Sequence, residues 1–507
     1  MKKRVAIIGA GPGGLTSGMI LAHRGYDVTV LEKFATVGGR NAPIQAGPYI
    51  FDTGPTFLHQ KFTLNEIFAE TGRKAEDYLK FKKLDPMTRL TWPDVSMETS
   101  TDEEKMTRNI EAAFPGESAN YHRFMEDHAE KLKAIFPCLQ KPYHQLRKYL
   151  DPKLLKALPY VATNKSVMDA LGEYFHDDRL KLAFTFQAKY LGMSPWKCPA
   201  LFSILSYIEY AHGIYHVEGG LCEISNSMAK IVKEEGGKIR LNCEVAEIKH
   251  EAGRATHVIL KNGESIPCDD VVINADYAQA KATMLGTRNE APEALKKKKF
   301  SCSTFMLYLG LDKIYEDEPH HHIIFADNYE KNIAEIQGER IVSDDMSVYV
   351  RNSSINDKTV APEGHSQLYI LCPTINTRNG FSWEKNHADY RERVLNRIIE
   401  KTGMKDLREH IVEERCITPE TWEEGNIFMG ATFNLAHTLD QMLYLRPRNR
   451  LSGFANLYLV GGGTHPGSGL PTIYESGRIS SNLLCESYGD FHKRVDFASG
   501  IFNDSVA

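Results

Sequence analysis

The fold is decided by residues 5–40, VAIIGAGPGGLTSGMILAHRGYDVTVLEKFATVGGR, which predict a strand, a glycine turn, a helix and a second strand. The apolar run from Val5 to Ile8 is typical of a buried parallel strand, and it leads directly into Gly9, Gly11 and Gly14. The first glycine permits a tight turn, the second lets backbone N–H groups approach a diphosphate, and the third lets the helix pack closely on the strand. The stretch therefore predicts a dinucleotide site at the start of a parallel sheet.

The second strand, expected from Asp27 to Leu31, delivers Glu32, eighteen residues after Gly14. An acid at this distance accepts hydrogen bonds from ribose hydroxyls and repels a 2′-phosphate, which argues against NADP. A membrane span or a signal peptide is the alternative interpretation, because Lys2, Lys3 and Arg4 precede an apolar run. Five glycines and Pro12 would make that run a poor helix, and no cleavage site of small residues is evident.

A second glycine turn, Gly38-Gly39-Arg40, directly follows the ribose acid, and FDTGPTFL follows at residues 51–58. A plain NAD-binding unit has no need of this turn. With these motifs the chain resembles the bacterial carotenoid desaturases of the phytoene and diapophytoene desaturase family, FAD-dependent oxidoreductases related to amine oxidases. The resemblance implies that FAD is the cofactor, with Gly39, Arg40 and Gly54 among its ligands.

The composition is that of an ordinary globular chain of 507 residues, with 42% hydrophobic and 25% charged residues. A net charge of −5 gives no overall field that would attract nucleic acid. The nine cysteines show no CxxC or regular spacing, which argues against a disulfide framework and against a zinc site. No later apolar run is long enough to predict a membrane span.

Residues 102 to about 190 have a helical pattern without the glycine turns of a nucleotide fold, and we expect an inserted helical region there. Within it, residues 131–165 combine eight basic side chains with interleaved leucines and tyrosines. Such a stretch is suited to the headgroup region of an anionic membrane. A solvated helix face that covers the core explains the pattern equally well.

The middle of the chain is expected to return to the first sheet. From His216 the pattern predicts a turn, a helix, strands joined by turns at Gly253 and at residues 262–263, and a buried strand at 271–273. No second GxGxxG accompanies it, so a separate second nucleotide fold is not expected. In the resembling family, the backbone of the valine that matches Val245 contacts the adenine.

Residues from about 300 to 450 are expected to form a second sheet that roofs a long substrate cavity, with strands at 305–311 and 366–373. The run His320-His321-His322 suggests a metal, but adjacent residues of a strand point to opposite faces and could not easily converge on one ion. A loop after Pro319 is the preferred interpretation, and no metal site is predicted.

The last motif is NLYLVGGGTHPGSGLPTIYESGR at residues 456–478, a buried strand, a glycine turn and a helix. It predicts a second strand-to-helix anion site that completes the binding of the FAD diphosphate. By the resemblance, Gly462, Gly463, Leu470 and Pro471 contact the cofactor, and His465 is the candidate for a polar role beside the flavin. A turn residue without chemistry is the alternative for His465.

The predicted fold class is therefore α/β, with a discontinuous Rossmann-type FAD-binding domain like that of amine oxidases and glutathione reductase, a substrate domain and a helical insertion. The expected boundaries are 1–101, 214–285 and 451–490 for the three FAD-binding parts, 102–213 for the insertion, 286–450 for the substrate domain, and 491–507 for a C-terminal tail.

The resemblance implies desaturation of a linear carotenoid precursor of the phytoene or diapophytoene class. Such a long apolar isoprenoid offers no carbonyl and no leaving group, so the reaction needs a hydride acceptor, which flavin N5 supplies to an allylic CH₂. The expected location is cytoplasmic, peripherally associated with the inner face of the cell membrane, with a quinone or oxygen as electron acceptor.

The competing enzyme classes on the same scaffold are a carotenoid oxygenase or isomerase, a retinol-saturase-like enzyme and a flavin amine oxidase. The THPGSGLP segment resembles carotenoid enzymes more than amine oxidases. A non-catalytic carrier of apolar pigment is the alternative outside enzymes, and the intact flavin motifs argue against it.

Overall fold

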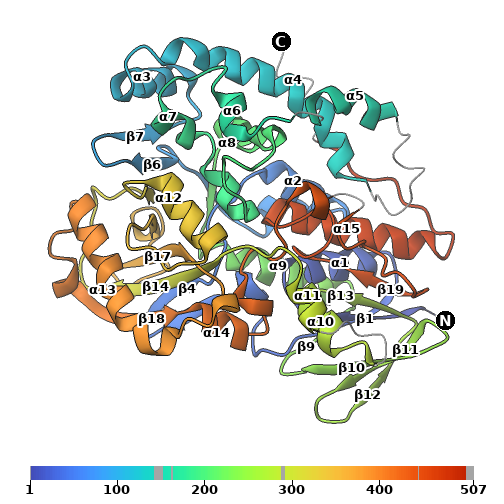
Figure 1. Cartoon of the computed structure of the whole chain (residues 1–507). Coiled ribbons are helices and arrows are strands. Elements are labelled where there is room, and N and C mark those ends of the chain that lie inside the picture. Colours follow the sequence, from blue (N-terminus) through green and yellow to red (C-terminus); the bar gives the residue numbers. More distant parts are fainter. Residues whose placement is uncertain (1, 142–151, 162–163, 287–291, 443–444, 498–507) are drawn as a thin grey trace.

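The structure is a computed structural model that describes residues 2–141, 152–161, 164–286, 292–442 and 445–497 (Figure 1). It contains a parallel sheet with helices on one side, a larger mixed sheet, and a helical region that covers one face of the larger sheet. Among the helices of the described residues, none has the length and apolar character needed to cross a bilayer.

The first sheet is built from three distant parts of the chain, as the sequence predicted. Its strand order is β19 (Leu457–Leu459), β13 (Asp270–Ile273), β1 (Arg4–Ile8), β2 (Asp27–Leu31) and β9 (Lys238–Arg240). All neighbouring pairs are parallel, with Val5 opposite Val28 and Val271 opposite Leu457. Strands β1, β13 and β19 bury nearly every side chain because both faces of the sheet are covered there, whereas the edge strand β9 is partly exposed.

One face of this sheet carries α1 (Pro12–His23), α9 (Cys222–Glu234) and α15 (Leu470–Glu486), and the other carries an antiparallel sheet of β10 (Val245–Glu251), β11 (Arg254–Leu260) and β12 (Ser265–Pro267) (Figure 1). Glycines set the close approach of these layers. A Cβ at Gly14 would lie 2.2 Å from the carbonyl oxygen of Gly9, and one at Gly477 would lie 2.8 Å from the carbonyl oxygen of Gly13.

The second sheet has the order β18 (Ile411–Ile417), β14 (Ser303–Leu311), β17 (Ser366–Thr374), β16 (Val348–Asn352), β15 (His321–Ile324), β6 (Thr88–Thr91) and β7 (Ser96–Thr99). The strands expected at 305–311 and 366–373 are confirmed. One face packs on α13 (Trp383–Lys401), and the other carries tyrosines and faces the helical region. Strands β6 and β7 come from the segment expected as the first FAD-binding part, so this part of residues 1–101 lies in the second sheet.

The inserted region is helical where the structure describes it. It comprises α3 (Glu103–Ala113), α4 (Tyr121–Leu139), α5 (Pro152–Val161), α6 (Val167–Leu171), α7 (Asp178–Ala183) and α8 (Ile204–His212), which lie at the top of Figure 1. Their apolar side chains form one core with the inner face of the second sheet. Much of the basic stretch at 131–165, namely residues 142–151 and 162–163, lies outside the described residues.

The histidine run is not a loop, and this prediction was wrong. His321 and His322 begin the buried strand β15. They are accommodated because each side chain finds a partner: His321 Nδ1 lies 2.7 Å from the Tyr349 hydroxyl, and His322 Nε2 lies 2.8 Å from Thr91 Oγ1. Burial lowers the pKa of His321 well below its usual value, so its imidazole is neutral in the core.

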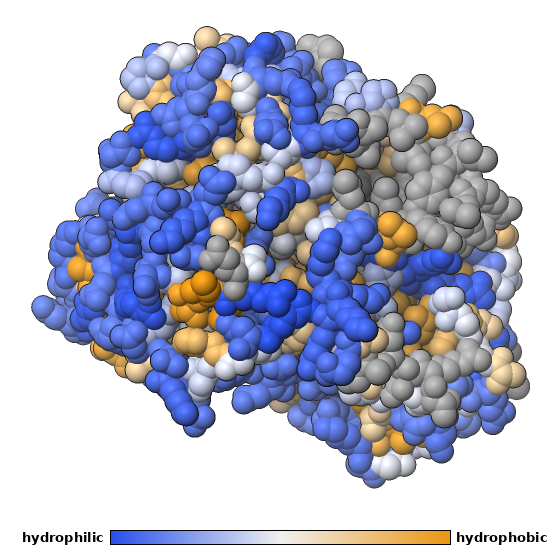
Figure 2. Space-filling view, viewed as in Figure 1, coloured by the Kyte–Doolittle hydropathy of each residue, from blue (hydrophilic) through white to orange (hydrophobic). Residues whose placement is uncertain are grey.

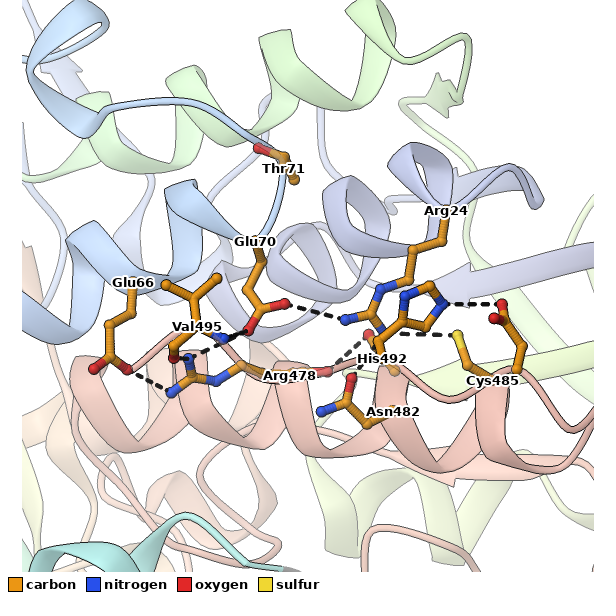
Figure 3. A network of polar contacts seen from close by, with 12 residues as sticks. Arg24, Glu66, Glu70, Thr71, Arg478, Asn482, Cys485, His492 and Val495 are labelled. Atoms are coloured by element: carbon orange, nitrogen blue, oxygen red, sulfur yellow. Dashed lines mark hydrogen bonds and ion pairs between the residues drawn. The ribbon is translucent and has the colours of Figure 1, made fainter. Parts of the chain in front are cut away.

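A buried ion network fastens α15 to α2 (Lys61–Ala69), and Figure 3 shows Arg478 of α15 reaching toward Glu66 and Glu70. Arg478 is fully buried, and its Nη2 lies 2.9 Å from Glu66 Oε2, while Glu475 pairs with the same guanidinium. Arg24, which follows α1 as its C-cap, adds a second cation, 3.1 Å from Glu70. The network also holds the tail, since the Val495 N–H donates to Glu70 at 3.1 Å.

Replacing Arg478 by methionine should strongly destabilise the protein, because it leaves three carboxylates buried together with less positive charge. Breaking a buried pair on one side typically costs about 3–5 kcal/mol. The matched control is Arg108→Met, since Arg108 pairs with Glu104 on an exposed surface, where such a pair contributes roughly 0–1 kcal/mol. Urea unfolding should show a much lower midpoint for Arg478→Met than for the control; equal midpoints would contradict the network's importance.

Candidate functional site

The site is a cavity of about 890 Å³ at the carboxyl ends of the first sheet's strands. Its lining brings together nine of the residues that the sequence predicted as cofactor ligands: Gly9, Gly11, Glu32, Gly39, Arg40, Val245, Gly462, Gly463 and Leu470. These residues come from the beginning, the middle and the end of the chain. Their convergence on one cavity at this edge is the arrangement expected for a dinucleotide in an open α/β sheet.

Two helix N-termini open into the cavity. Gly11 is the N-cap of α1 and Gly469 that of α15, and neither helix start is capped by a side-chain hydrogen bond. Gly11, Pro12 and Leu470 line the cavity next to these ends. Because the first N–H groups of a helix lack partners within the helix and carry the positive end of its dipole, both ends favour an anion.

The glycines around the cavity leave the space that a diphosphate needs. A Cβ at Gly11 would lie 2.9 Å from Asn274 Nδ2, one at Gly462 would lie 2.8 Å from Ser468 Oγ, and one at Gly463 would lie 2.6 Å from Tyr277 Cβ. Side chains at these positions would displace the cavity walls. The residues present therefore fit a dinucleotide bound close to the backbone.

Glu32 is buried at the cavity wall and is held in one orientation by the backbone. Its Oε2 accepts a hydrogen bond from the Ala10 N–H at 2.7 Å, and its Oε1 accepts one from the Phe34 N–H at 3.0 Å. A carboxylate has further lone pairs beyond these two bonds. Glu32 can therefore accept hydrogen bonds from ribose hydroxyls without reorienting.

Arg40 belongs to a buried polar chain that sequence analysis only partly found. Its Nη1 donates to the Thr432 carbonyl at 2.8 Å, and burial lowers its pKa. The hydrogen-bond pattern orients the Asn434 amide so that its oxygen accepts from Arg40 Nη1 at 2.9 Å and its nitrogen donates to Asp276 Oδ2 at 2.7 Å. Burial raises the pKa of Asp276. All three residues line the cavity, where Arg40 supplies positive charge.

Asp276 and Asn434 were missed by the sequence analysis. Asp276 stands just after β13, at the carboxyl end of a parallel strand, and that position was a usable signal. Asn434 has a left-handed backbone with φ of 62°, and nothing in its local sequence marks a cavity residue.

Three predicted ligands do not line the cavity. Gly14 serves the helix-to-strand contact described above. Gly54 supports the Arg40 loop, since a Cβ there would lie 2.8 Å from the Arg40 carbonyl oxygen. Pro471 occupies the first turn of α15, between Leu470 and a wall position at Ile473. A direct cofactor contact for these three stays a prediction.

His465, the predicted catalytic candidate, also lies outside the cavity lining. Its Nε2 lies 2.8 Å from the Lys141 carbonyl oxygen, and its backbone N–H donates to the Pro447 carbonyl at 3.0 Å. Burial lowers its pKa to about 4, so the ring is neutral at physiological pH. The structure thus connects His465 to the segment that follows α4, and a chemical role for its ring stays a prediction.

Part of the cavity lining is apolar, and it was not predicted residue by residue. It includes Ile44, Ile417, Trp422 and Ile427. Trp422 belongs to α14 (Pro419–Glu424), and its indole N–H is held 3.1 Å from Thr304 Oγ1 of β14. Thr421 of the same helix also lines the cavity. An apolar wall of this kind suits a flat aromatic ring and excludes water from it.

The FDTGP segment joins the cavity to the tyrosine face of the second sheet. Thr53 and Pro55 line the cavity, the Tyr308 hydroxyl donates to the Thr53 carbonyl at 2.6 Å, and the Tyr349 hydroxyl lies 2.9 Å from Thr56 Oγ1. Tyr349 also lines a second cavity, of about 20 Å³, which includes Phe186, Phe325 and Leu371 in its walls. The segment therefore links the main cavity to the tyrosine face of the second sheet.

Comparison with known proteins agrees with this geometry. The family model for flavin-containing amine oxidoreductases matches residues 12–485. A 4,4′-diapophytoene desaturase (4,4′-diapolycopene-forming) of Methylomonas sp is 47% identical over 96% of this chain and 96% of its own length. The all-trans-zeta-carotene desaturase of Myxococcus xanthus is 38% identical over 96% of this chain and 94% of its own.

Solved structures share the fold at low sequence identity. An oxidoreductase from Methanosarcina mazei superposes with a TM-score of 0.61 at 18% identity, covering 94% of this chain and 99% of its own. Cyclohexylamine oxidase from Brevibacterium oxydans superposes with a TM-score of 0.59 at 15% identity, with 100% of both chains covered. Both the sequence relatives and the cavity point to one class of enzyme. The chain therefore belongs to the flavin-containing amine oxidoreductase family and, with FAD as its cofactor, to the carotenoid desaturases within it.

Proposed function

We propose that the protein desaturates a linear carotenoid precursor of the diapophytoene or phytoene class, with the C30 diapophytoene as the preferred substrate. The observation that carries the choice of substrate is the 47% identity to a 4,4′-diapophytoene desaturase over nearly the whole of both chains. The structural support is the apolar core between the helical region and the tyrosine face of the second sheet, to which the FDTGP segment links the main cavity.

Bound FAD supplies the hydride acceptor for such a reaction. Among this chain's residues, Glu32 and Val245 are placed to hold the adenosine part, and the N-termini of α1 and α15 to hold the diphosphate. The wall around Trp422 keeps water out. Because a hydrocarbon offers no polar group for recognition, the aromatic walls must orient it by shape alone.

We propose that His465 acts indirectly. Its ring joins the last FAD-binding segment to the carbonyl of Lys141 in the segment that follows α4. It is therefore placed to fix the position of the glycine turn relative to the helical region. A direct contact with the reacting atoms is not needed for this role.

Peripheral association with the cytoplasmic face of the cell membrane is a further part of the proposal, because the substrate and a quinone acceptor would both reside in the bilayer. Oxygen is the alternative acceptor. The face in Figure 2 is largely hydrophilic, with scattered hydrophobic residues rather than one broad patch. Basic residues at 131–165, together with the exposed Leu155 of α5, are the surface that we propose to contact anionic lipid.

Several described lysines of this stretch already have partners. Lys131 is 3.3 Å from Ser203 Oγ, Lys133 is 2.8 Å from Glu130, and Lys165 pairs with Glu173. The proposal therefore depends on the remaining basic residues, of which Arg147 and Lys148 lie outside the described residues.

Product analysis tests the proposed reaction. Expressed with a C30 or a C40 precursor pathway, the protein should convert diapophytoene into a more conjugated product and phytoene less efficiently, as read by chromatography and absorption spectra. Gly11→Val should abolish conversion, because a Cβ there already lies 2.9 Å from Asn274 Nδ2 and the larger side chain would displace the cavity wall. Gly338→Ala is the matched control, since a Cβ there meets no atom within 4 Å. Conversion of only an oxygenated or already conjugated carotenoid would favour an oxygenase or isomerase.

Glu32→Ala should weaken FAD retention without changing the product formed at saturating FAD. Hydrogen bonds to a charged acceptor contribute about 1.5–3 kcal/mol, so affinity should fall by roughly 10- to 100-fold. Glu264→Ala is the matched control, because Glu264 pairs with Arg240 on an exposed surface away from the lining. The ratio of flavin to protein absorbance after gel filtration measures the effect, and an unchanged ratio would count against the ribose contact.

Replacing Lys148, Lys153 and Lys156 by glutamate should weaken binding to anionic vesicles. Each basic residue near such a surface contributes about 1 kcal/mol, so three should account for at least 100-fold in affinity. The control replaces Lys296, Lys297 and Lys298, a similar triple on and after α11 (Pro292–Lys296). Cosedimentation with vesicles containing phosphatidylglycerol compares them; equal binding of both triples would support the solvated-helix interpretation.

A further inference from the structure

A carboxyl group is buried in the apolar helical region without full hydrogen bonding. Glu209 of α8 is completely buried. Its Oε2 accepts a hydrogen bond from Gln187 Nε2 at 3.1 Å, while its Oε1 has no hydrogen-bond partner within the described residues. Burial raises the pKa of Glu209 to about 7, despite the Gln187 bond. Such a group is costly to keep in a core, and a stabilising role alone does not explain it.

A histidine faces this carboxyl from the segment that follows the FAD motif. His59 stands four residues after Pro55, which lines the main cavity, and its Nε2 lies 3.8 Å from Glu209 Oε2. About 27% of the His59 side chain is accessible, yet burial lowers its pKa to about 4. The side chain is therefore partly accessible although its surroundings disfavour the charged ring.

The pair lies near the tyrosine face of the second sheet. The His59 ring stacks on Phe57, with centroids 5.6 Å apart and planes at 7°, and Phe57 stacks on His321 at 4.2 Å. Gln187 directly follows Phe186, a wall residue of the second cavity. Through Phe57, whose ring centroid lies 5.1 Å from that of Tyr349, and through Gln187, the pair is next to wall residues of the second cavity.

We propose that His59 is the proton acceptor of the desaturation and that Glu209 is the positioning residue that orients its ring and stabilises its protonated form. This rests on the proposed function. Glu209 Oε2 lies 3.8 Å from His59 Nε2, beyond hydrogen-bond distance but within that of an ion pair, so an ionised carboxyl would favour the protonated ring, and Nδ1 is the atom that takes the proton.

In the proposed step, one C–H bond of the substrate breaks and its electron pair leaves as hydride, for which bound FAD is the oxidant. The adjacent carbon then loses a proton to His59 Nδ1, and the electron pair of that second C–H bond becomes the new C=C bond. A hydrogen next to an allylic cation is strongly acidic, so a base of low pKa is sufficient when it is held in position.

Other titratable groups around the pair are already engaged. His321 of β15 is fully buried and its Nδ1 lies 2.7 Å from Tyr349. The Tyr210 hydroxyl of α8 donates to the Ala183 carbonyl at 2.6 Å. On α4, which packs against α8, His128 and Lys131 both lie within hydrogen-bond distance of Ser203 Oγ. Of these histidines, His59 alone combines an accessible face with a carboxylate partner.

The pair predicts a specific pH dependence. Below a pH of about 7 the Glu209 carboxyl is protonated and cannot stabilise an imidazolium, so the reaction should be slow. As pH rises through about 7 the carboxylate forms, and the rate of flavin reduction by substrate should rise with it. Removing the carboxylate should lower the rate and remove this dependence.

The test measures anaerobic flavin reduction by diapophytoene in phosphatidylcholine vesicles from pH 5.5 to 8.5. We expect His59→Asn to be about 100-fold slower at all pH values. The rate of flavin reduction in Glu209→Gln should be lower than in the parent at pH 8 and should not change as pH passes through 7. Glu209→Asp should keep part of the pH dependence. His122→Asn, an exposed histidine of α4, is the control and should match the parent. Flavin content should be equal in all variants.

A readout without turnover completes the test. The infrared difference spectrum between the parent and Glu209→Gln, without substrate, should contain a protonated carboxyl band that disappears near pH 7. The proposal would be overturned if His59→Asn reduced its flavin as fast as the parent protein, or if Glu209→Gln kept the pH dependence of the parent. Failure of the proposed function is distinguishable, because the parent itself would then form no desaturated product from either precursor.

Discussion

The structure depends on the close approach of two helix N-termini that only glycine permits. A side chain at Gly477 would meet the Gly13 carbonyl oxygen at 2.8 Å, so α15 can pack on α1 only without one. This contact brings the first and last motifs of the chain to the same cavity. Two helix N-termini at this cavity favour a doubly charged diphosphate more strongly than a single N-terminus would, because the positive ends of both dipoles point into the same cavity. The third contribution, from Arg40, is held by Asn434 and Asp276, which come from two further segments.

Burial of charge is handled differently in different parts of the molecule. Arg478 meets carboxylates from α2 and from its own helix, so its charge is compensated by direct ion pairs. Arg351 of β16 lies 2.7 Å from Asp52 and 3.0 Å from His216, which fixes the FDTGP segment to the second sheet. Glu209 has only an amide and a neutral histidine beside it, and its ionisation is correspondingly unfavourable. The first two networks stabilise the fold, whereas the third leaves a group whose protonation can change.

The sequence predicted the parts of the site that follow from local rules. The glycine turns, Glu32 and the flanking strands depend on backbone geometry within about 30 residues, and each lies where it was expected. Trp422 and Asn434 could not be predicted in this way, because their place at the cavity results from how β14 and the C-terminal segment pack. His321 and His322 were assigned to a loop after Pro319 because adjacent side chains of a strand could not converge on one ion; their partners Tyr349 and Thr91 come from distant strands. For His465, sequence proximity to the glycine turn suggested the flavin, but the ring contacts the segment that follows α4.

The order of strands in the first sheet has a consequence for synthesis of the protein. The edge strand β19 pairs with β13, and the lining glycines at 461–463 follow it directly. The ribosome therefore has to synthesise almost the entire chain before the cofactor cavity is complete, although the first glycine turn of that cavity is made at the outset. Until then β13 presents an unpaired edge of Val271 to Ile273, which is a hazard for aggregation. We expect flavin to enter only after translation ends, and a nascent chain shortened before residue 457 to depend on chaperones for solubility.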